Sequence, residues 1–146
     1  MKKGIFLVLI LFFVACGGEA SAEPQIINIG SLGSEMKYDL NEFTVKAGAP
    51  VKIILKNNTP LEYQGDMKHN IVIFNDESAA MQIIKLAEGN GGNPYPDGRI
   101  LAFSSLIDKQ EETVLEFIAP KKPGKYLYVC TFIAHAMSMR GYMIVE

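Results

Sequence analysis

Short apolar segments separated by turn residues make up most of the chain. Within these segments apolar and β-branched residues recur at every second position, the period of a half-buried strand. Turn signals such as AGAP (47–50) and NNTP (57–60) lie between them. The pattern predicts strands at residues 25–29, 36–45, 51–56, 69–74, 100–107, 112–118, 124–130 and 141–145. The period slips between Leu40 and Phe43, which predicts a bend or bulge in the second of these strands.

One segment has the periodicity of a helix instead. In residues 77–88 (ESAAMQIIKLAE) the apolar side chains form a single stripe, made of Ala80, Ile83, Ile84 and Ala87. The glycine-rich stretch GNGGNPYPDG at 89–98 predicts a long loop after this helix. Short strands joined by turns, with one helix in an insertion between two strands, indicate an all-β antiparallel sandwich or barrel.

The N-terminus follows a different pattern. MKKGIFLVLILFFVACGG combines two lysines with an apolar run that is too short for a stable membrane anchor but suits the core of a signal peptide. The small residues around Cys16 resemble a bacterial lipobox. We therefore predict a lipoprotein-type signal peptide at 1–15, a lipidated Cys16 with a flexible tether at 16–23, and the folded domain at 24–146. An ordinary cleaved signal and a retained anchor are the alternatives, and all three place the domain on the periplasmic side of a bacterial membrane.

Composition limits the class of protein without assigning a function. An apolar fraction of 49% and a charged fraction of 21% are typical of a folded domain. The formal net charge of −2 becomes more negative when Lys2 and Lys3 leave with the signal peptide, so we expect no nucleic-acid partner. An acylated Cys16 cannot form a disulfide, which leaves Cys130 as a free thiol in an oxidising compartment. Such a thiol is either buried or bound to something.

Soft donor atoms gather near the C-terminus, in the stretch CTFIAHAMSMRG at 130–141. Cys130, His135 and two methionines lie on the predicted connection between the last two strands, and His69 begins an earlier strand. If these strands are neighbours, four side chains converge: His69, Cys130, His135 and Met139. Two imidazoles, a thiol and a thioether favour copper that cycles between Cu(I) and Cu(II). Structural zinc prefers more thiolates, calcium and magnesium prefer oxygen, and iron–sulfur clusters need more cysteines.

This stretch and the segment MKHN at 67–70 resemble the copper-binding segments of the small blue copper proteins, the cupredoxins, and are closest to azurins and auracyanins. The spacings Cys-x4-His-x3-Met and Met-x-His-Asn carry the resemblance, which extends loosely over residues 38–146. It implies a Greek-key β-sandwich that binds one type 1 copper ion. It also implies that His69, Cys130 and His135 form a trigonal plane, with Met139 rather than Met137 as a weak axial ligand.

The resemblance further implies roles for residues beside these ligands. Asn70 and Thr131 would hydrogen-bond to each other and hold the loop, and the backbone carbonyl of Lys68 would be a distant axial oxygen. Ile133-Ala134 departs from the family, which often has Pro-Gly at these positions. The disulfide of azurins has no counterpart in this sequence.

From these features we expect an electron-transfer protein and not an enzyme. It would pass single electrons between extracytoplasmic redox proteins such as c-type cytochromes or membrane respiratory complexes, as a monomer held to the membrane by its lipid. The resemblance implies docking through an apolar patch of Ala134, Ala136 and Met137 around an exposed edge of His135. A periplasmic copper carrier or storage protein is the main alternative, and a metal-free interaction module is a weaker one. A Cys–His hydrolase is disfavoured because no third orienting group is evident.

Overall fold

The computed structural model describes residues 23–146. The predicted signal peptide, the predicted lipidated Cys16 and all of the predicted tether except Glu23 lie outside the described residues. The strands are β1 (Gln25–Gly30), β2 (Glu42–Val45), β3 (Pro50–Lys56), β4 (Val72–Phe74), β5 (Ile100–Phe103), β6 (Glu112–Ile118), β7 (Gly124–Val129) and β8 (Arg140–Val145). A short 3₁₀ helix, η1 (Glu77–Ala79), and the helix α1 (Ala80–Glu88) lie between β4 and β5.

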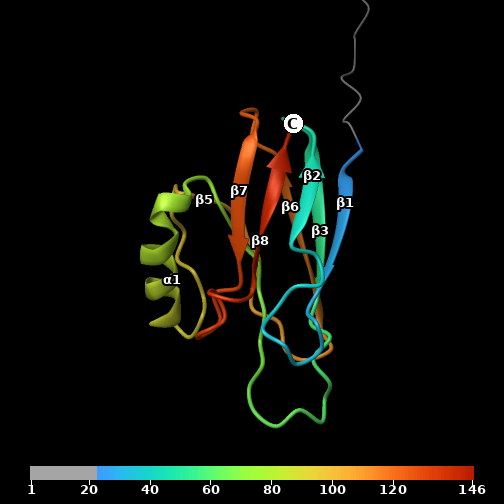
Figure 1. The fold of residues 1–146 in the computed structure, drawn as a ribbon, viewed down its shortest axis with the longest axis vertical. Coiled ribbons are helices and arrows are strands. Elements are labelled where there is room, and N and C mark those ends of the chain that lie inside the picture. The colour runs from blue at the N-terminus through green and yellow to red at the C-terminus, as the bar shows by residue number, and fades with distance from the viewer. Residues whose placement is uncertain (1–22) are drawn as a thin grey trace, which may run out of the picture.

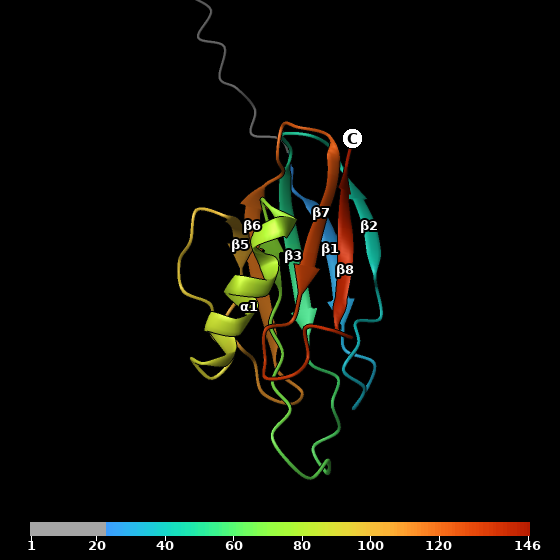
Figure 2. The same ribbon diagram turned by 60° about the vertical axis from the view of Figure 1, so that its left-hand side comes forward.

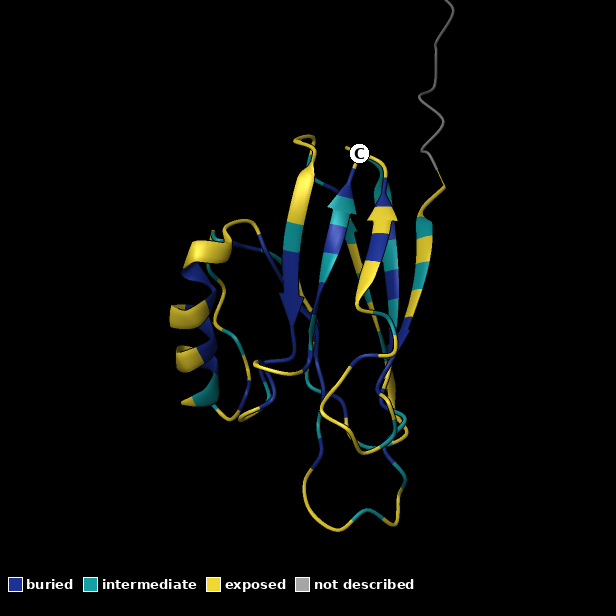
Figure 3. Cartoon of the chain, viewed as in Figure 1, coloured by how far each residue is buried: buried dark blue, intermediate teal, exposed yellow. Residues whose placement is uncertain are grey.

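Two sheets pack face to face (Figure 1). One has the strand order β1-β3-β6, and the other has the order β2-β8-β7-β4-β5. Alternate side chains of β3 and β8 turn inward, among them Ile53, Leu55 and Met143, while their neighbours along each strand are more exposed (Figure 3). These inward side chains form the main core. The predicted all-β sandwich with one helix in an inter-strand insertion is confirmed.

Helix α1 forms a third layer on the outer face of the five-stranded sheet (Figure 2). Its predicted apolar stripe is buried, and it builds a second core with residues of β4, β5 and β7. The strand β4 is therefore buried on both faces. Asp76 begins the helical segment by accepting a hydrogen bond from the backbone N–H of Ser78 (2.9 Å). Within residues 23–146, no helix has the length and hydropathy needed to cross a bilayer.

Two strand pairs are parallel, which corrects the expectation of a fully antiparallel sandwich. β1 pairs in parallel with β3, and β2 pairs in parallel with β8. The reason is the path of the chain. β2 follows β1 in sequence but joins the opposite sheet, so the chain crosses between the sheets and returns before it forms β3. A strand that returns in this way runs in the same direction as the first, and a local sequence pattern does not reveal it.

Several predicted strands are shorter than expected because side chains replace parts of the backbone ladder. Residues 36–41 form no strand, since the Asp39 carboxylate accepts a hydrogen bond from Gly30 N (2.7 Å) and this segment returns to the end of β1. β4 begins only at Val72, because the backbone N–H of Ile71 donates to the Ser104 hydroxyl (3.1 Å). Ahead of β4, His69 forms a single bridge with Ile107. His69 is thus held at a strand end, outside the continuous sheet.

Candidate metal centre

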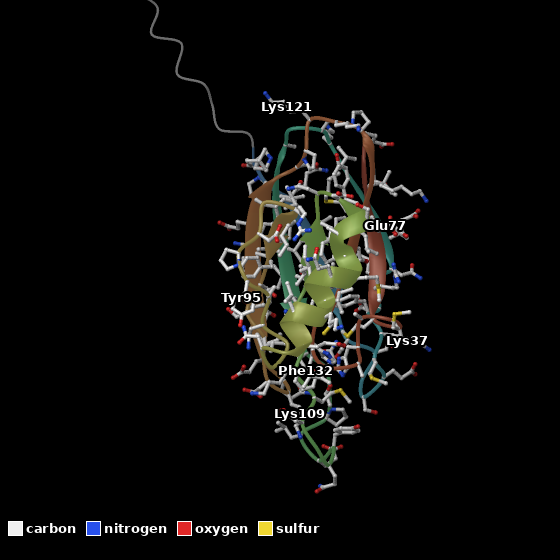
Figure 4. All side chains as sticks on the ribbon, turned by 90° about the vertical axis from the view of Figure 1, so that its left-hand side faces the viewer. Lys37, Glu77, Tyr95, Lys109, Lys121 and Phe132 are labelled. Carbon is white, nitrogen blue, oxygen red and sulfur yellow. The ribbon has the colours of Figure 1, made fainter. Side chains whose placement is uncertain are left out.

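The predicted donor residues meet at one end of the sandwich because of how three strands are ordered. Cys130 directly follows β7, Met139 directly precedes β8, and these strands form an antiparallel pair joined by the 130–139 connection. β4 is antiparallel to β7, with Val72 opposite Val129, so the segment before β4 lies beside the end of β7. His69 is in that segment. Figure 4 shows Phe132, two residues after Cys130, in the half of the molecule away from Lys121.

Three of the four predicted donor residues form a compact cluster. The distance from Cys130 Sγ to His69 Nδ1 is 3.9 Å, and the distance to His135 Nδ1 is 3.6 Å. All three donor atoms lie within 4.8 Å of one another, and all three residues are buried. A metal bonded to sulfur at about 2.3 Å and to nitrogen at about 2.0 Å, with trigonal angles, would hold these atoms about 3.7 Å apart. The cluster therefore has the spacing of a metal site, and its one sulfur and two nitrogens fit copper.

The fourth predicted donor, Met139, lies at the end of the same loop, directly before β8. Its side chain is fully buried in the same core cluster as Cys130. Backbone hydrogen bonds hold the turn closed, since Cys130 N donates to Met139 O (2.9 Å) and Met139 N donates to His135 O (2.8 Å). Met137 is 69% exposed and lies on the surface. Burial thus distinguishes the two methionines, while the ligand role of Met139 stays a prediction.

Asn70 and Thr131 join the segment before β4 to the segment after β7. Thr131 N donates to Asn70 Oδ1 (2.9 Å), and Asn70 Nδ2 donates to Thr131 Oγ1 (2.9 Å). The Thr131 hydroxyl donates in turn to the carbonyl of Gly92 (2.8 Å), in the loop after α1. The Tyr38 hydroxyl donates to the backbone carbonyl of Asn70. Both Asn70 and Thr131 are fully buried, so these bonds are shielded from water and fix the residues that follow His69 and Cys130.

Lys68 and Thr59 also lie near the site. Lys68 precedes His69, and its ammonium pairs with Asp108 at the surface (3.0 Å); the axial role of its carbonyl stays a prediction. Thr59 was not anticipated. Its hydroxyl lies 3.5 Å from Nε2 of His69, the ring nitrogen that faces away from Cys130, and donates to Gly33 O (3.0 Å). A metal-binding histidine usually donates its other N–H to such a partner, which fixes the ring. In the sequence, Thr59 belongs only to the predicted turn NNTP, which does not indicate a contact with His69.

Burial sets the protonation of the cluster. It lowers the pKa of His69 to about 4, with a smaller contribution from His135, and it also lowers the pKa of His135. Burial raises the pKa of the Cys130 thiol to about 11. At neutral pH both imidazoles of the metal-free protein are therefore neutral and can donate a lone pair. The thiol keeps its proton until a metal displaces it.

The low pKa of His69 predicts that acid destabilises the metal-free protein. The pKa of an unfolded histidine is about 6.5, so between pH 6.5 and about 4 the unfolded chain binds a proton that folded His69 does not. The free energy of unfolding is therefore unaffected by His69 above pH 6.5 and decreases as the pH is lowered through this window. At the lower end of the window the loss is on the order of 3 kcal/mol. Urea unfolding at pH 7 and pH 4 measures the loss. His69→Gln should lose stability less steeply, and an equal loss in both proteins would contradict the assignment.

The predicted docking patch and the predicted exposed edge of His135 both need correction. Ala134 and Met137 are exposed as expected, but Ala136 is only 2% exposed because it packs in the second core beneath α1. Ile133 is 54% exposed and takes its place in the apolar surface of the loop. His135 is 3% exposed, so little of its ring reaches the surface. Phe132 packs edge-on against that ring, with the ring centroids 5.0 Å apart.

Comparison with known proteins agrees with this donor set. Residues 25–146 match the family described as copper binding proteins, plastocyanin/azurin family. Auracyanin-A of Chloroflexus aurantiacus is 32% identical over 161 aligned positions, which cover all of this chain and 96% of that protein. The solved structure of auracyanin A, described as a "blue" copper protein from the same bacterium, superposes with a TM-score of 0.76 at 33% identity, covering 85% of this chain and all of that one. An auracyanin from Roseiflexus castenholzii superposes at 0.74 with 31% identity, covering 83% and 96%.

Proposed function

Because this chain belongs to the plastocyanin/azurin family of copper-binding proteins, we propose that it is a type 1 copper protein that carries single electrons between redox proteins. One observation supports this function most directly. The Sγ atom of Cys130 lies 3.9 Å from Nδ1 of His69 and 3.6 Å from Nδ1 of His135, in a buried cluster at the ends of strands. When bound there, copper supplies a one-electron couple between Cu(II) and Cu(I).

The protein supplies a rigid set of donors. Cys130 and His69 are held by the Asn70–Thr131 hydrogen bonds and by the bridge to Ile107. Donors that are fixed from several sides move little when the charge at the site changes, so little reorganisation opposes electron transfer. A copper carrier or store would need donors that exchange the metal readily, and the burial of the three donors does not favour that alternative. We propose no substrate chemistry at this site, because its three donors are buried.

We propose that electrons enter and leave at the 130–139 loop. Among the three clustered donors only His135 has measurable exposure, and the exposed side chains of Ile133 and Met137 lie on the same loop. A small apolar contact of this kind suits a transient complex with another redox protein, such as a c-type cytochrome or a membrane respiratory complex. For the location, residues 1–23 support export and lipidation at Cys16. Mass spectrometry of the protein from its native membrane tests this, and an N-terminus without an acyl chain on Cys16 would overturn it.

Adding one equivalent of Cu(II) to the protein tests the function. We expect an intense visible absorption band from charge transfer between thiolate and copper, together with reversible one-electron reduction. A colourless Cu(II) complex with the same stoichiometry would contradict the type 1 assignment. It would leave the copper carrier as the better hypothesis.

Replacing Met139 with leucine should keep the colour and raise the reduction potential. Loss of a weak axial thioether removes donation that favours Cu(II), and leucine fills the same buried volume. We expect a rise of roughly 60 mV, which for one electron is a tenfold change in relative affinity for the two oxidation states. Met137→Leu is the matched control on the same loop and should change neither property. If the two outcomes were exchanged in voltammetry, Met137 would be the axial donor.

A further inference from the structure

The backbone just before His135 has an unusual conformation. Ala134 has φ of +65°, and among residues 23–146 Gln110 is the one other non-glycine residue with positive φ. In this region the Cβ of an L-residue crowds the following carbonyl, so alanine has no intrinsic preference for it. A residue is found there when its surroundings hold it there. Part of that hold comes from the loop itself, since His135 N donates to Phe132 O (2.9 Å) and closes a turn with Ala134 at the position that takes positive φ. Alanine does not favour this position by itself, so a contact from outside the turn adds to the hold.

That contact comes from the end of helix α1. The Glu88 carboxylate accepts a hydrogen bond from Ala134 N, with Oε1 and N 3.1 Å apart. Glu88 is the last residue of α1, where a negative charge faces the negative end of the helix dipole. Its position is thus unfavourable for the helix itself. Within the described part of the chain no ion pair involves Glu88, so its contact with Ala134 is the one specific interaction that its carboxylate makes.

The loop after α1 contacts the same segment a second time. Gly92 O accepts the hydrogen bond from the Thr131 hydroxyl (2.8 Å), and Gly92 packs directly on Phe132. A Cβ on Gly92 would lie 2.9 Å from the Cα of Phe132, so the two backbones are in van der Waals contact. Glu88 and Gly92 therefore hold the loop on both sides of Phe132, between Cys130 and His135.

We propose that Glu88 is a positioning residue for His135. By accepting from the N–H of Ala134, its carboxylate adds to the turn bond between Phe132 and His135 in keeping Ala134 left-handed, and so in keeping Nδ1 of His135 directed at Cys130 Sγ. The Ile133-Ala134 segment of the loop therefore takes part of its rigidity from helix α1, which lies in the insertion between β4 and β5. The effect of Glu88 on a bound copper ion rests on the function proposed above, whereas its hydrogen bond to Ala134 does not.

Amide hydrogen exchange in the metal-free protein tests directly whether Glu88 restrains the N–H of Ala134. Glu88→Ala should speed the exchange of the Ala134 amide by about threefold or more, the low end for a hydrogen bond, because this bond is exposed to solvent. Alanine is the best helix former, so a weaker α1 cannot explain faster exchange. Glu88→Gln keeps a carbonyl acceptor and should have a smaller effect. Lys85→Ala, on the same helix, is the matched control and should leave Ala134 unchanged.

The copper-loaded protein tests the consequence for His135. Glu88→Ala should shift the visible and electron paramagnetic resonance spectra of Cu(II), because His135 is no longer aimed by the loop. Adding Ala134→Gly to this variant should restore the spectra but not the slow exchange, since glycine adopts positive φ without strain. If the Ala134 amide exchanged at the native rate in Glu88→Ala, Glu88 would not restrain this N–H. Faster exchange with unchanged spectra would overturn the positioning role, and a native protein without the blue band would instead contradict the proposed function.

Discussion

Replacing Cys130 with serine is expected to abolish the visible absorption of the Cu(II) protein. The Sγ atom of Cys130 lies 3.9 and 3.6 Å from the Nδ1 atoms of His69 and His135. A hydroxyl is a harder donor that keeps its proton near neutral pH, so the thiolate that gives the colour is lost. Copper affinity should also fall by more than about 100-fold, since loss of an outer partner alone can cost 10–100-fold. Spectrophotometric titration with Cu(II) measures both effects.

The serine hydroxyl enters a fully buried position, so folding must be checked separately. Cys130→Ala removes the donor without adding a polar group, and it should be equally colourless while keeping the native circular dichroism spectrum. Met137→Leu, on the same loop but exposed, should titrate like the native protein. A blue band that persists in either Cys130 variant would show that another group supplies the charge transfer.

Replacing Asn70 with leucine should lower the free energy of unfolding of the metal-free protein by about 3 kcal/mol. The substitution leaves the backbone N–H of Thr131 without its acceptor at 2.9 Å and the Thr131 hydroxyl without the donor Asn70 Nδ2. Both groups are buried away from water, so the unpaired N–H costs its full desolvation penalty, while the hydroxyl keeps its bond to Gly92 O and adds a smaller loss. Chemical denaturation measures the change.

Asn75 provides the matched control for this variant. It lies five residues further along, is exposed, and donates a long hydrogen bond to Gly98 O (3.4 Å). Asn75→Ala should therefore change stability by less than about 0.5 kcal/mol. If Asn70→Leu cost no more than this control, the Asn70–Thr131 bonds would not be what joins the two segments of the site.

Local sequence patterns predicted most strands because the alternation of apolar residues and the positions of turn residues indicate the same strand boundaries. β6 has the predicted bounds, Glu112–Ile118, and β7 and β8 differ from prediction by one residue each. The meeting of Cys130 and His135 also followed from local reasoning, since both lie on one hairpin connection. The place of His69 required the further assumption that β4 and β7 are neighbours, and the observed pairing of Val72 with Val129 satisfies it.

What could not be predicted depends on contacts between distant parts of the chain. Ala136 looks like a surface residue in sequence, but it is covered by a helix whose position follows from tertiary packing. Thr59 reaches His69 only because the 57–68 loop passes under the site. The Glu88–Ala134 contact spans 46 residues, and no motif connects them. The parallel pairing of β1 with β3 and of β2 with β8 was missed for the same reason, because strand order across two sheets is a property of the whole fold.

The parallel pairing of β1 with β3 has a geometric consequence for how the protein would meet its partners. Because β3 ends at Lys56, just before the loop beneath the metal centre, the parallel strand β1 begins at the opposite pole of the sandwich (Figure 1). If Cys16 is lipidated as proposed, its tether would join the domain at that pole, so the His135 end would be the end farther from the point of attachment. Redox proteins that diffuse freely, or whose cofactor domains project above the membrane, would then encounter that end more often than proteins whose surface is level with the lipid headgroups.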